Sequence, residues 1–152
     1  MNHIEFFKLQ AKNLFRDYQT RFTYADSVDG NSYYSYAPRY FDIERIFLEF
    51  DWDEENFSLM KAQHLVALLM GFKNWADLLH APKFDLELAK LLFDHQEKIH
   101  LEDWSIYIAQ AERDNDTTFS TKEKIEIFKQ VFVNAEGYDN PFGDCRLEKR
   151  AH

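Results

Sequence analysis

Apolar residues recur at intervals of three and four along most of the chain. Over residues 3–19 they form one continuous stripe, which consists of Ile4, Phe7, Ala11, Leu14, Phe15 and Tyr18. This spacing is typical of an amphipathic helix that buries one face. The same periodicity predicts further helices over residues 59–70, 83–99, 101–113 and 121–135. Residues 40–50 fit a helix or a strand, and we favour a helix.

Start and stop signals are clearest around residues 58–79. Ser58 is a good N-cap for the helix at 59–70. Gly71 suits the left-handed stop that follows a helix. Asn74, with Asp77 three residues later, resembles a capping box and predicts a short helix over 75–81. We therefore expect a helix, a glycine stop and a second capped helix, with this segment at the centre of the core.

The spacing within residues 58–79 also resembles a known module. The matching positions are Ala62, Gln63, Ala67, Gly71, Phe72, Trp75 and Leu78. They are similar to a helix-turn-helix-like module of uncharacterised bacterial proteins, some of which are glyoxalase-related or repeat-containing. The resemblance covers 22 of 152 residues and implies a helical fold with no assigned catalytic residue. The whole chain also resembles a family of small, all-helical bacterial cytosolic proteins of unknown function. Glyoxalase chemistry does not carry over, because its metal-binding βαβββ repeats have no counterpart in this helical pattern.

Residues 20–40 show no sustained period and contain Asp29-Gly30-Asn31. We expect an ordered loop of unusual length. It clusters four tyrosines beside Arg39, namely Tyr33, Tyr34, Tyr36 and Tyr40. These side chains could stack a nucleobase or grip a peptide, because tyrosine offers rigid contact area at low entropic cost. The alternative is that the tyrosines cover the core with their hydroxyls in water.

The composition agrees with a helical fold. Four glycines and three prolines are too few for a turn-rich sandwich or barrel, and the chain length fits one domain. We expect an all-α, single-domain bundle of about six helices with a long tyrosine-rich loop. The domain would cover residues 1–145, and residues 146–152 would form a frayed, charged tail.

The formal net charge of −9 opposes broad binding to a phosphate backbone. The negative charge is concentrated, because residues 41–60 carry seven acidic side chains against one basic residue. Four of these acids follow one another closely and form a second candidate binding surface: Asp51, Asp53, Glu54 and Glu55. An acidic surface of this kind favours a basic protein partner.

No pattern in the sequence predicts a metal or a cofactor. The strings Asp51-x-Asp53-x-Glu55 and Asp114-x-Asp116-x-Thr118 lack the glycine and glutamate that a calcium loop needs at its sixth and twelfth positions. The second string also matches phosphotransferases with an aspartyl nucleophile, but that chemistry needs a preceding buried strand, and a polar helix end stands there. No two histidines stand four residues apart, as a helical metal site would favour.

Cys145 is the only cysteine, so no disulfide can form within the chain, and a reducing compartment is the simpler expectation. The first residues lack the basic and apolar regions of a signal peptide. No stretch approaches 18 consecutive apolar residues, so we expect no membrane span. These features together favour a cytoplasmic protein.

The leading hypothesis is a non-enzymatic protein-interaction or regulatory module with an acidic surface. Its partner would be a protein, basic in the simplest case, or a second copy of the chain. One alternative is a hydrolase or transferase that uses the acids near residues 51–55 or 114–116. Another is a nucleic-acid-binding regulator that uses residues 58–79. We disfavour the latter because its second helix carries Asp77 and offers no arginine or lysine to a groove.

Overall fold

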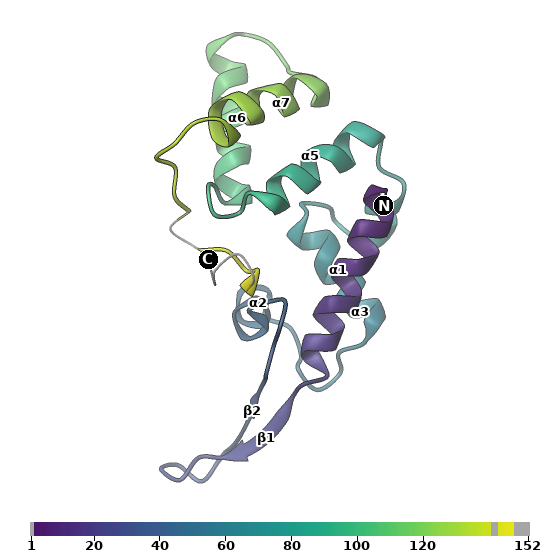
Figure 1. The fold of residues 1–152 in the computed structure, drawn as a ribbon, viewed down its shortest axis with the longest axis vertical. Helices are drawn as coiled ribbons and strands as arrows, with labels where there is room; N and C mark the ends of the chain where they lie inside the picture. Colours follow the sequence, from purple (N-terminus) through teal and green to yellow (C-terminus); the bar gives the residue numbers. More distant parts are fainter. Residues whose placement is uncertain (1, 141–142, 148–152) are drawn as a thin grey trace.

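The structure is a computed structural model that describes residues 2–140 and 143–147. The chain is mostly helical, as predicted (Figure 1). The helices are α1 His3–Tyr18, α2 Ile43–Phe50, α3 Leu59–Leu69, α4 Trp75–Leu79, α5 Lys83–Asp94, α6 Leu101–Asp114 and α7 Thr121–Phe128. A π-helical turn, Lys129–Val133, continues α7. No helix in the described ranges is both long and apolar enough to cross a membrane.

The predicted N-caps of α3 and α4 are confirmed, and Asn74 forms one half of the predicted capping box. The Ser58 hydroxyl accepts the backbone N–H of Lys61 at 3.2 Å, and the Asn74 side chain accepts that of Asp77 at 2.8 Å. Gly71 has a φ of +88°, and a Cβ there would lie 3.3 Å from the side chain of Leu101. Both the backbone angle and the close contact therefore favour glycine at this stop.

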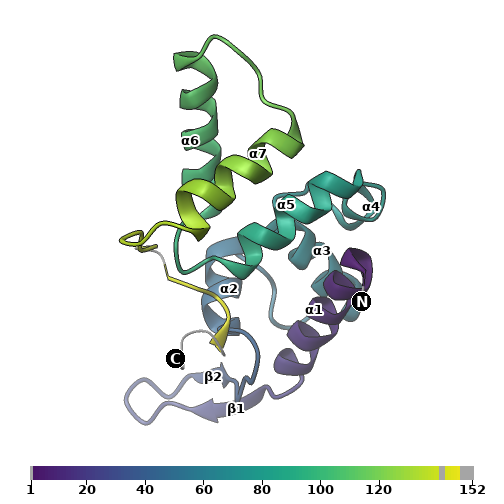
Figure 2. The ribbon, with the colours of Figure 1, turned by 45° about the horizontal axis from the view of Figure 1, so that its top comes forward.

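Two hydrophobic clusters meet along α5. The first packs α1, α2, α3 and α4 against the α5 face that carries Leu86, Ala89 and Phe93. The second packs α6, α7 and the π-helical turn around Trp104, Ile108, Phe128 and Phe132, and the opposite side of α5 joins it through Leu88, Leu91 and Leu92. Figure 2 shows α5 between the two groups of helices.

Residues 20–40 are not the irregular loop that the sequence predicted, and the all-α expectation is wrong there. Strands β1 Phe22–Ala25 and β2 Ser32–Ser35 pair in an antiparallel hairpin, with Phe22 opposite Ser35 and Ala25 opposite Ser32. The backbone N–H of Asp26 donates to the carbonyl of Asn31 at 2.8 Å and closes the turn. The hairpin projects from the helices in both views (Figures 1 and 2).

The end of α5 also differs from the prediction, because the helix stops at Asp94 and not near residue 99. The backbone carbonyl groups that follow α5 instead accept hydrogen bonds from Asn140, a residue near the C-terminus. Asn140 donates its side-chain N–H to the Gln96 carbonyl at 2.7 Å and its backbone N–H to the Glu97 carbonyl at 3.0 Å. Hydrogen bonds between residues more than forty positions apart in the sequence thus replace the last predicted turn of the helix.

Arg146 and Leu147 do not behave as a frayed tail. The Arg146 side chain is buried and forms ion pairs with Asp144 at 2.7 Å and Glu97 at 3.2 Å. The backbone N–H of Leu147 donates to the carbonyl of Tyr40 at 3.0 Å. Burial of a guanidinium is tolerated when carboxylates surround it, as here. The remaining predicted tail, residues 148–152, lies outside the described residues.

A buried carboxylate ties the hairpin to α1. Asp17 lies in the last turn of α1 with 1% of its surface exposed. Its two oxygens accept the backbone N–H groups of Arg39, Tyr40 and Phe41 at 2.8, 3.0 and 2.7 Å. A buried charge is stable only when hydrogen bonds replace its hydration, and these three donors do so. Asp17 therefore fixes the chain where it returns from the hairpin.

We predict that Asp17→Asn lowers the free energy of unfolding by about 2–4 kcal/mol, because the amide replaces an accepting oxygen with a donor and leaves a buried N–H unpaired. Urea unfolding followed by circular dichroism measures the change. Asp103→Asn, at an exposed position in the first turn of α6, is the matched control and should change stability by less than about 1 kcal/mol. Equal effects of the two substitutions would contradict this role of Asp17.

Candidate functional site: the hairpin and the acidic segment

The two candidate surfaces of the sequence lie against each other. We call Asp51, Asp53, Glu54 and Glu55 the acidic segment; it follows α2. The hydroxyl of Tyr34 on β2 donates to the Glu55 carboxylate at 3.1 Å, and that of Tyr36 donates to the Glu54 carboxylate at 2.8 Å. Part of the tyrosine cluster therefore holds the acidic segment in place.

The backbone of Glu54 is a further point of attachment. Its carbonyl accepts hydrogen bonds from the Tyr18 hydroxyl, at 2.6 Å, and from the Arg21 guanidinium. The guanidinium carbon of Arg21 also lies 4.3 Å from the centre of the Tyr34 ring, close enough for a cation–π contact. Helix α1, the base of the hairpin and the acidic segment thus meet in one polar cluster.

The electrostatics keep these tyrosines as neutral donors. Burial raises the pKa of Tyr36 far above its usual value, and the neighbouring Glu54 carboxylate adds to the effect. The hydrogen bond to Glu55 is the main cause of the raised pKa of Tyr34. A negative carboxylate beside a phenol opposes loss of the phenolic proton. Both side chains therefore keep their hydrogen bonds to the acidic segment across the neutral pH range.

The other acids of the segment shape the backbone. The Asp53 carboxylate accepts the N–H of Glu55 at 2.9 Å and the Asn56 amide at 2.9 Å. These bonds lower the pKa of Asp53, the backbone bond having the larger effect. Asp51 has a left-handed backbone with φ of +51°, directly after α2. Asp53 thus forms an Asx turn, a local bond typical of loops.

Arg39 and Tyr40 donate their backbone N–H groups to the Asp17 carboxylate. The Tyr40 ring packs against the first hydrophobic cluster. The guanidinium carbon of Arg39 lies 5.5 Å from the centre of this ring, and the Arg39 side chain is exposed. Of this pair, only Arg39 is placed on the surface.

The face of the hairpin opposite to Tyr34 is exposed to solvent. Side chains alternate between the two faces of a strand, and the register sets Phe22, Tyr24 and Tyr33 on the face that Tyr34 does not occupy. These three side chains are 52%, 48% and 40% exposed, and we call them the outward aromatic face. Tyr24 and Tyr33 are directly opposite each other, with ring centres 6.0 Å apart.

Acidic side chains stand at the tip of the hairpin beside this face. Asp26 and Asp29 belong to the turn, and the Tyr33 hydroxyl donates a hydrogen bond to the Asp29 carboxylate. That bond is the main reason why the pKa of Asp29 is lowered. Asp29 therefore stays negatively charged next to the aromatic rings.

Tyr33 is among the site residues predicted from the sequence, whereas Phe22 and Tyr24 are not. A signal for them exists, because Phe22-Thr23-Tyr24-Ala25 alternates large and small residues before a turn that contains Asp29-Gly30. Alternation on both sides of an Asp-Gly turn is typical of a hairpin. Pairing the two halves would have set these aromatics beside Tyr33.

The two groups of acids named for the enzyme alternative lie far apart. Asp114 and Asp116 lie at the turn between α6 and α7, at the opposite end of the molecule from the hairpin (Figures 1 and 2). Within the described ranges, no three histidine, cysteine, aspartate or glutamate side chains are grouped as a metal site requires. In the segment proposed to read DNA, α4 has five residues, and its Leu78 is fully buried.

Comparisons with known proteins add no assignment. No family model matches the chain, and neither a curated protein nor a solved structure matches it. The module resemblance at residues 58–79 stays a hypothesis.

We predict that Tyr36→Phe lowers the free energy of unfolding by about 1–2 kcal/mol at neutral pH, because the charged acceptor Glu54 loses its donor. The raised pKa of Tyr36 adds a pH dependence. Above about pH 10, the unfolded chain releases the phenolic proton that folded Tyr36 retains, so stability falls as pH rises.

Urea unfolding of the wild type and Tyr36→Phe at neutral pH and above pH 10 tests this contribution. The difference in stability between the two proteins should shrink at alkaline pH. Tyr107→Phe, at a partly exposed position on α6, is the control and should leave the wild-type pH dependence unchanged. If Tyr36→Phe has no larger effect than this control, the hydroxyl of Tyr36 does not anchor the acidic segment.

Proposed function

We propose that the protein is a non-enzymatic protein-interaction module that binds a basic segment of a partner protein on the outward aromatic face. One observation carries this proposal: three aromatic side chains remain about half exposed on a projecting hairpin whose other face is bonded to the helical body. Exposed aromatic rings supply much of the binding energy in protein interfaces.

The anchoring of the hairpin supports a role in binding. A two-stranded hairpin in isolation is marginally stable. Here Tyr34 contacts both Arg21 and Glu55, and Asp17 binds the segment that follows β2. An element that is ordered before binding loses little conformational entropy when a partner binds. Contacts with the helical body thus keep the hairpin ordered, with the outward aromatic face exposed to solvent.

The charge around the face favours a basic partner. Asp26 and Asp29 stand at the hairpin tip, and the exposed Glu55 binds Tyr34 on the inner face of the hairpin. Complementary charge steers association, and arginine or lysine side chains also bind the faces of tyrosine rings. Two copies of this chain would bring like charges together, so a basic protein is favoured over self-association through this face.

We predict that Tyr24→Ala lowers the affinity for the partner protein by about tenfold or more, since loss of a central aromatic contact costs at least about 1.4 kcal/mol of binding free energy. The tagged protein is used to capture partners from native lysate, and the captured protein is then purified. Its Kd is measured by calorimetry at low and moderate salt, and binding should weaken as salt rises.

The matched control is Ser32→Ala, on the same hairpin but on the opposite face. It should leave the Kd within about twofold of the wild type. The proposal fails if Tyr24→Ala and Ser32→Ala bind equally, or if the captured protein is acidic and binds independently of salt. Sedimentation of the purified chain distinguishes the self-association alternative, which predicts a dimer that Tyr24→Ala dissociates.

A further inference from the structure

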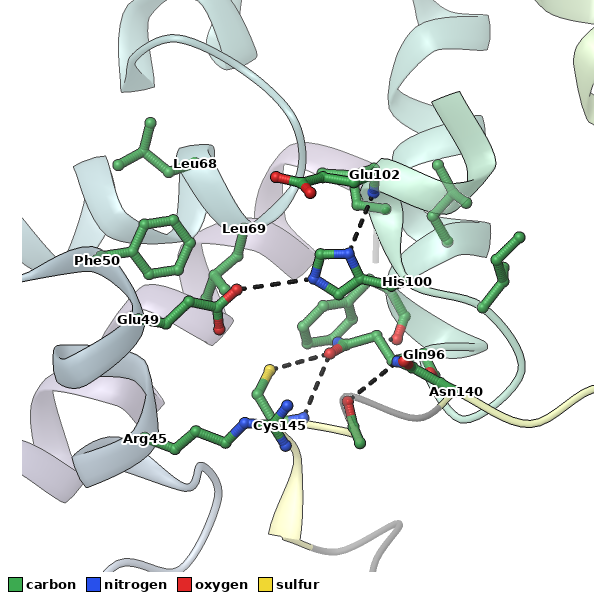
Figure 3. A pocket seen from close by; sticks show the side chains of 15 residues that line it. Arg45, Glu49, Phe50, Leu68, Leu69, Gln96, His100, Glu102, Asn140 and Cys145 are labelled. Atoms are coloured by element: carbon green, nitrogen blue, oxygen red, sulfur yellow. Dashed lines mark hydrogen bonds and ion pairs between the residues drawn. The ribbon is translucent and has the colours of Figure 1, made fainter. Parts of the chain in front are cut away.

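A partly enclosed cavity of about 180 Å³ lies away from the hairpin, where the two hydrophobic clusters meet. Its walls come from α2, the end of α3, the connection between α5 and α6, and the segment that contains Cys145 (Figure 3). The apolar part of the wall includes Leu69, Leu92, Phe93 and Ile99. An apolar cavity of about 150 Å³ is large enough to bind benzene. This cavity can therefore hold an apolar group of that size.

Arg45 supplies a positive charge at the cavity. Its side chain reaches from α2 toward Cys145 (Figure 3) and is half-buried. Among the described residues, none forms a hydrogen bond or ion pair with its guanidinium. A Cβ on residue 143 would lie 2.6 Å from the guanidinium, and Gly143 leaves that space open. A guanidinium without a protein partner, beside an apolar wall, is suited to bind a carboxylate.

Glu49 lines the cavity one helical turn after Arg45, and among the described residues the two side chains form no ion pair. Its carboxylate faces the Nε2 atom of His100 at 3.7 Å. The Nδ1 atom of His100 accepts the backbone N–H of Glu102, which leaves the ring proton on Nε2, toward Glu49. A carboxylate accepts several hydrogen bonds, so Glu49 retains capacity for a cationic ligand group. The cavity thus presents separate positive and negative groups beside an apolar wall.

Cys145 serves as part of the wall. Its thiol lies 3.0 Å from the Gln96 side-chain oxygen and donates to it, and burial raises the pKa of the thiol to about 12. A neutral thiol is a poor nucleophile. A ligand in the cavity would therefore bind without a covalent bond to Cys145.

We propose that this cavity binds a small zwitterion with an apolar side chain, of the size of an aromatic or branched α-amino acid. Its carboxylate would contact Arg45, its ammonium group would contact Glu49, and its side chain would lie on Leu69, Leu92 and Phe93. A simple anion is disfavoured because Glu49 and Glu102 both line the cavity, and a simple cation leaves Arg45 without a partner. This site is independent of the interaction proposed for the hairpin.

The test uses four probes: L-phenylalanine, 3-phenylpropionate, 2-phenylethylamine and toluene. Methyl NMR spectra of the leucine and isoleucine side chains report binding at concentrations up to about 10 mM. L-Phenylalanine should bind more tightly than each of the other probes. Arg45→Met should weaken L-phenylalanine and 3-phenylpropionate by about tenfold but leave 2-phenylethylamine within about twofold. Glu49→Gln should weaken L-phenylalanine and 2-phenylethylamine and spare 3-phenylpropionate.

Arg113→Met, exposed in the last turn of α6, is the matched control and should leave every affinity unchanged. Thermal unfolding confirms that each variant is folded, and Arg45→Lys provides a milder change if Arg45→Met is not. The proposal is overturned if no probe shifts the methyl resonances, if toluene binds as tightly as L-phenylalanine, or if the charge variants do not discriminate between the probes. None of these outcomes bears on the hairpin, which Tyr24→Ala tests separately.

Discussion

Asp17 is the constraint on which the placement of the hairpin depends. Its carboxylate is held almost out of contact with water at the end of α1, where three backbone N–H groups replace its hydration. Removal of a charge from water is costly unless each polar atom finds a partner. The chain satisfies that requirement only when residues 39–41 turn back past α1. This return sets the position of β2 and, through the strand register, the position of β1.

The two faces of the hairpin consequently have different roles. The inner face, with Tyr34, bonds to Arg21 and to the acidic segment, and Tyr36 extends these contacts to Glu54. The outer face keeps Phe22, Tyr24 and Tyr33 in water. The inner contacts keep the strands ordered, which a two-stranded ribbon alone does poorly, and leave the outer rings available to a partner.

Local signals predicted the helices well. The stripes along α1 and α3, the caps at Ser58 and Asn74 and the left-handed stop at Gly71 depend on residues close in sequence. Contacts between distant residues could not be predicted in this way. The end of α5 depends on Asn140, and the ordered position of Arg146 depends on Asp144 and Glu97.

The candidate site could likewise be predicted where it depends on local signals but not where it depends on contacts between distant residues. The sequence identified the tyrosines and the acids but not that Tyr34 and Tyr36 bind Glu55 and Glu54, because those pairs are separated by 21 and 18 residues. The alternation of Phe22 and Tyr24 was visible in the sequence. Its meaning depended on pairing with residues 32–35, since strands of four residues carry too little pattern alone.

Site-specific photo-crosslinking tests the division between the two faces most directly. A benzoylphenylalanine is placed at position 24 on the outward aromatic face or at position 25 on the other face, in cells that naturally produce the protein. We expect position 24 to crosslink one basic protein, with little product from position 25. Equal crosslinking from both positions, or none from position 24 in a folded protein, would contradict a binding role for the outward aromatic face.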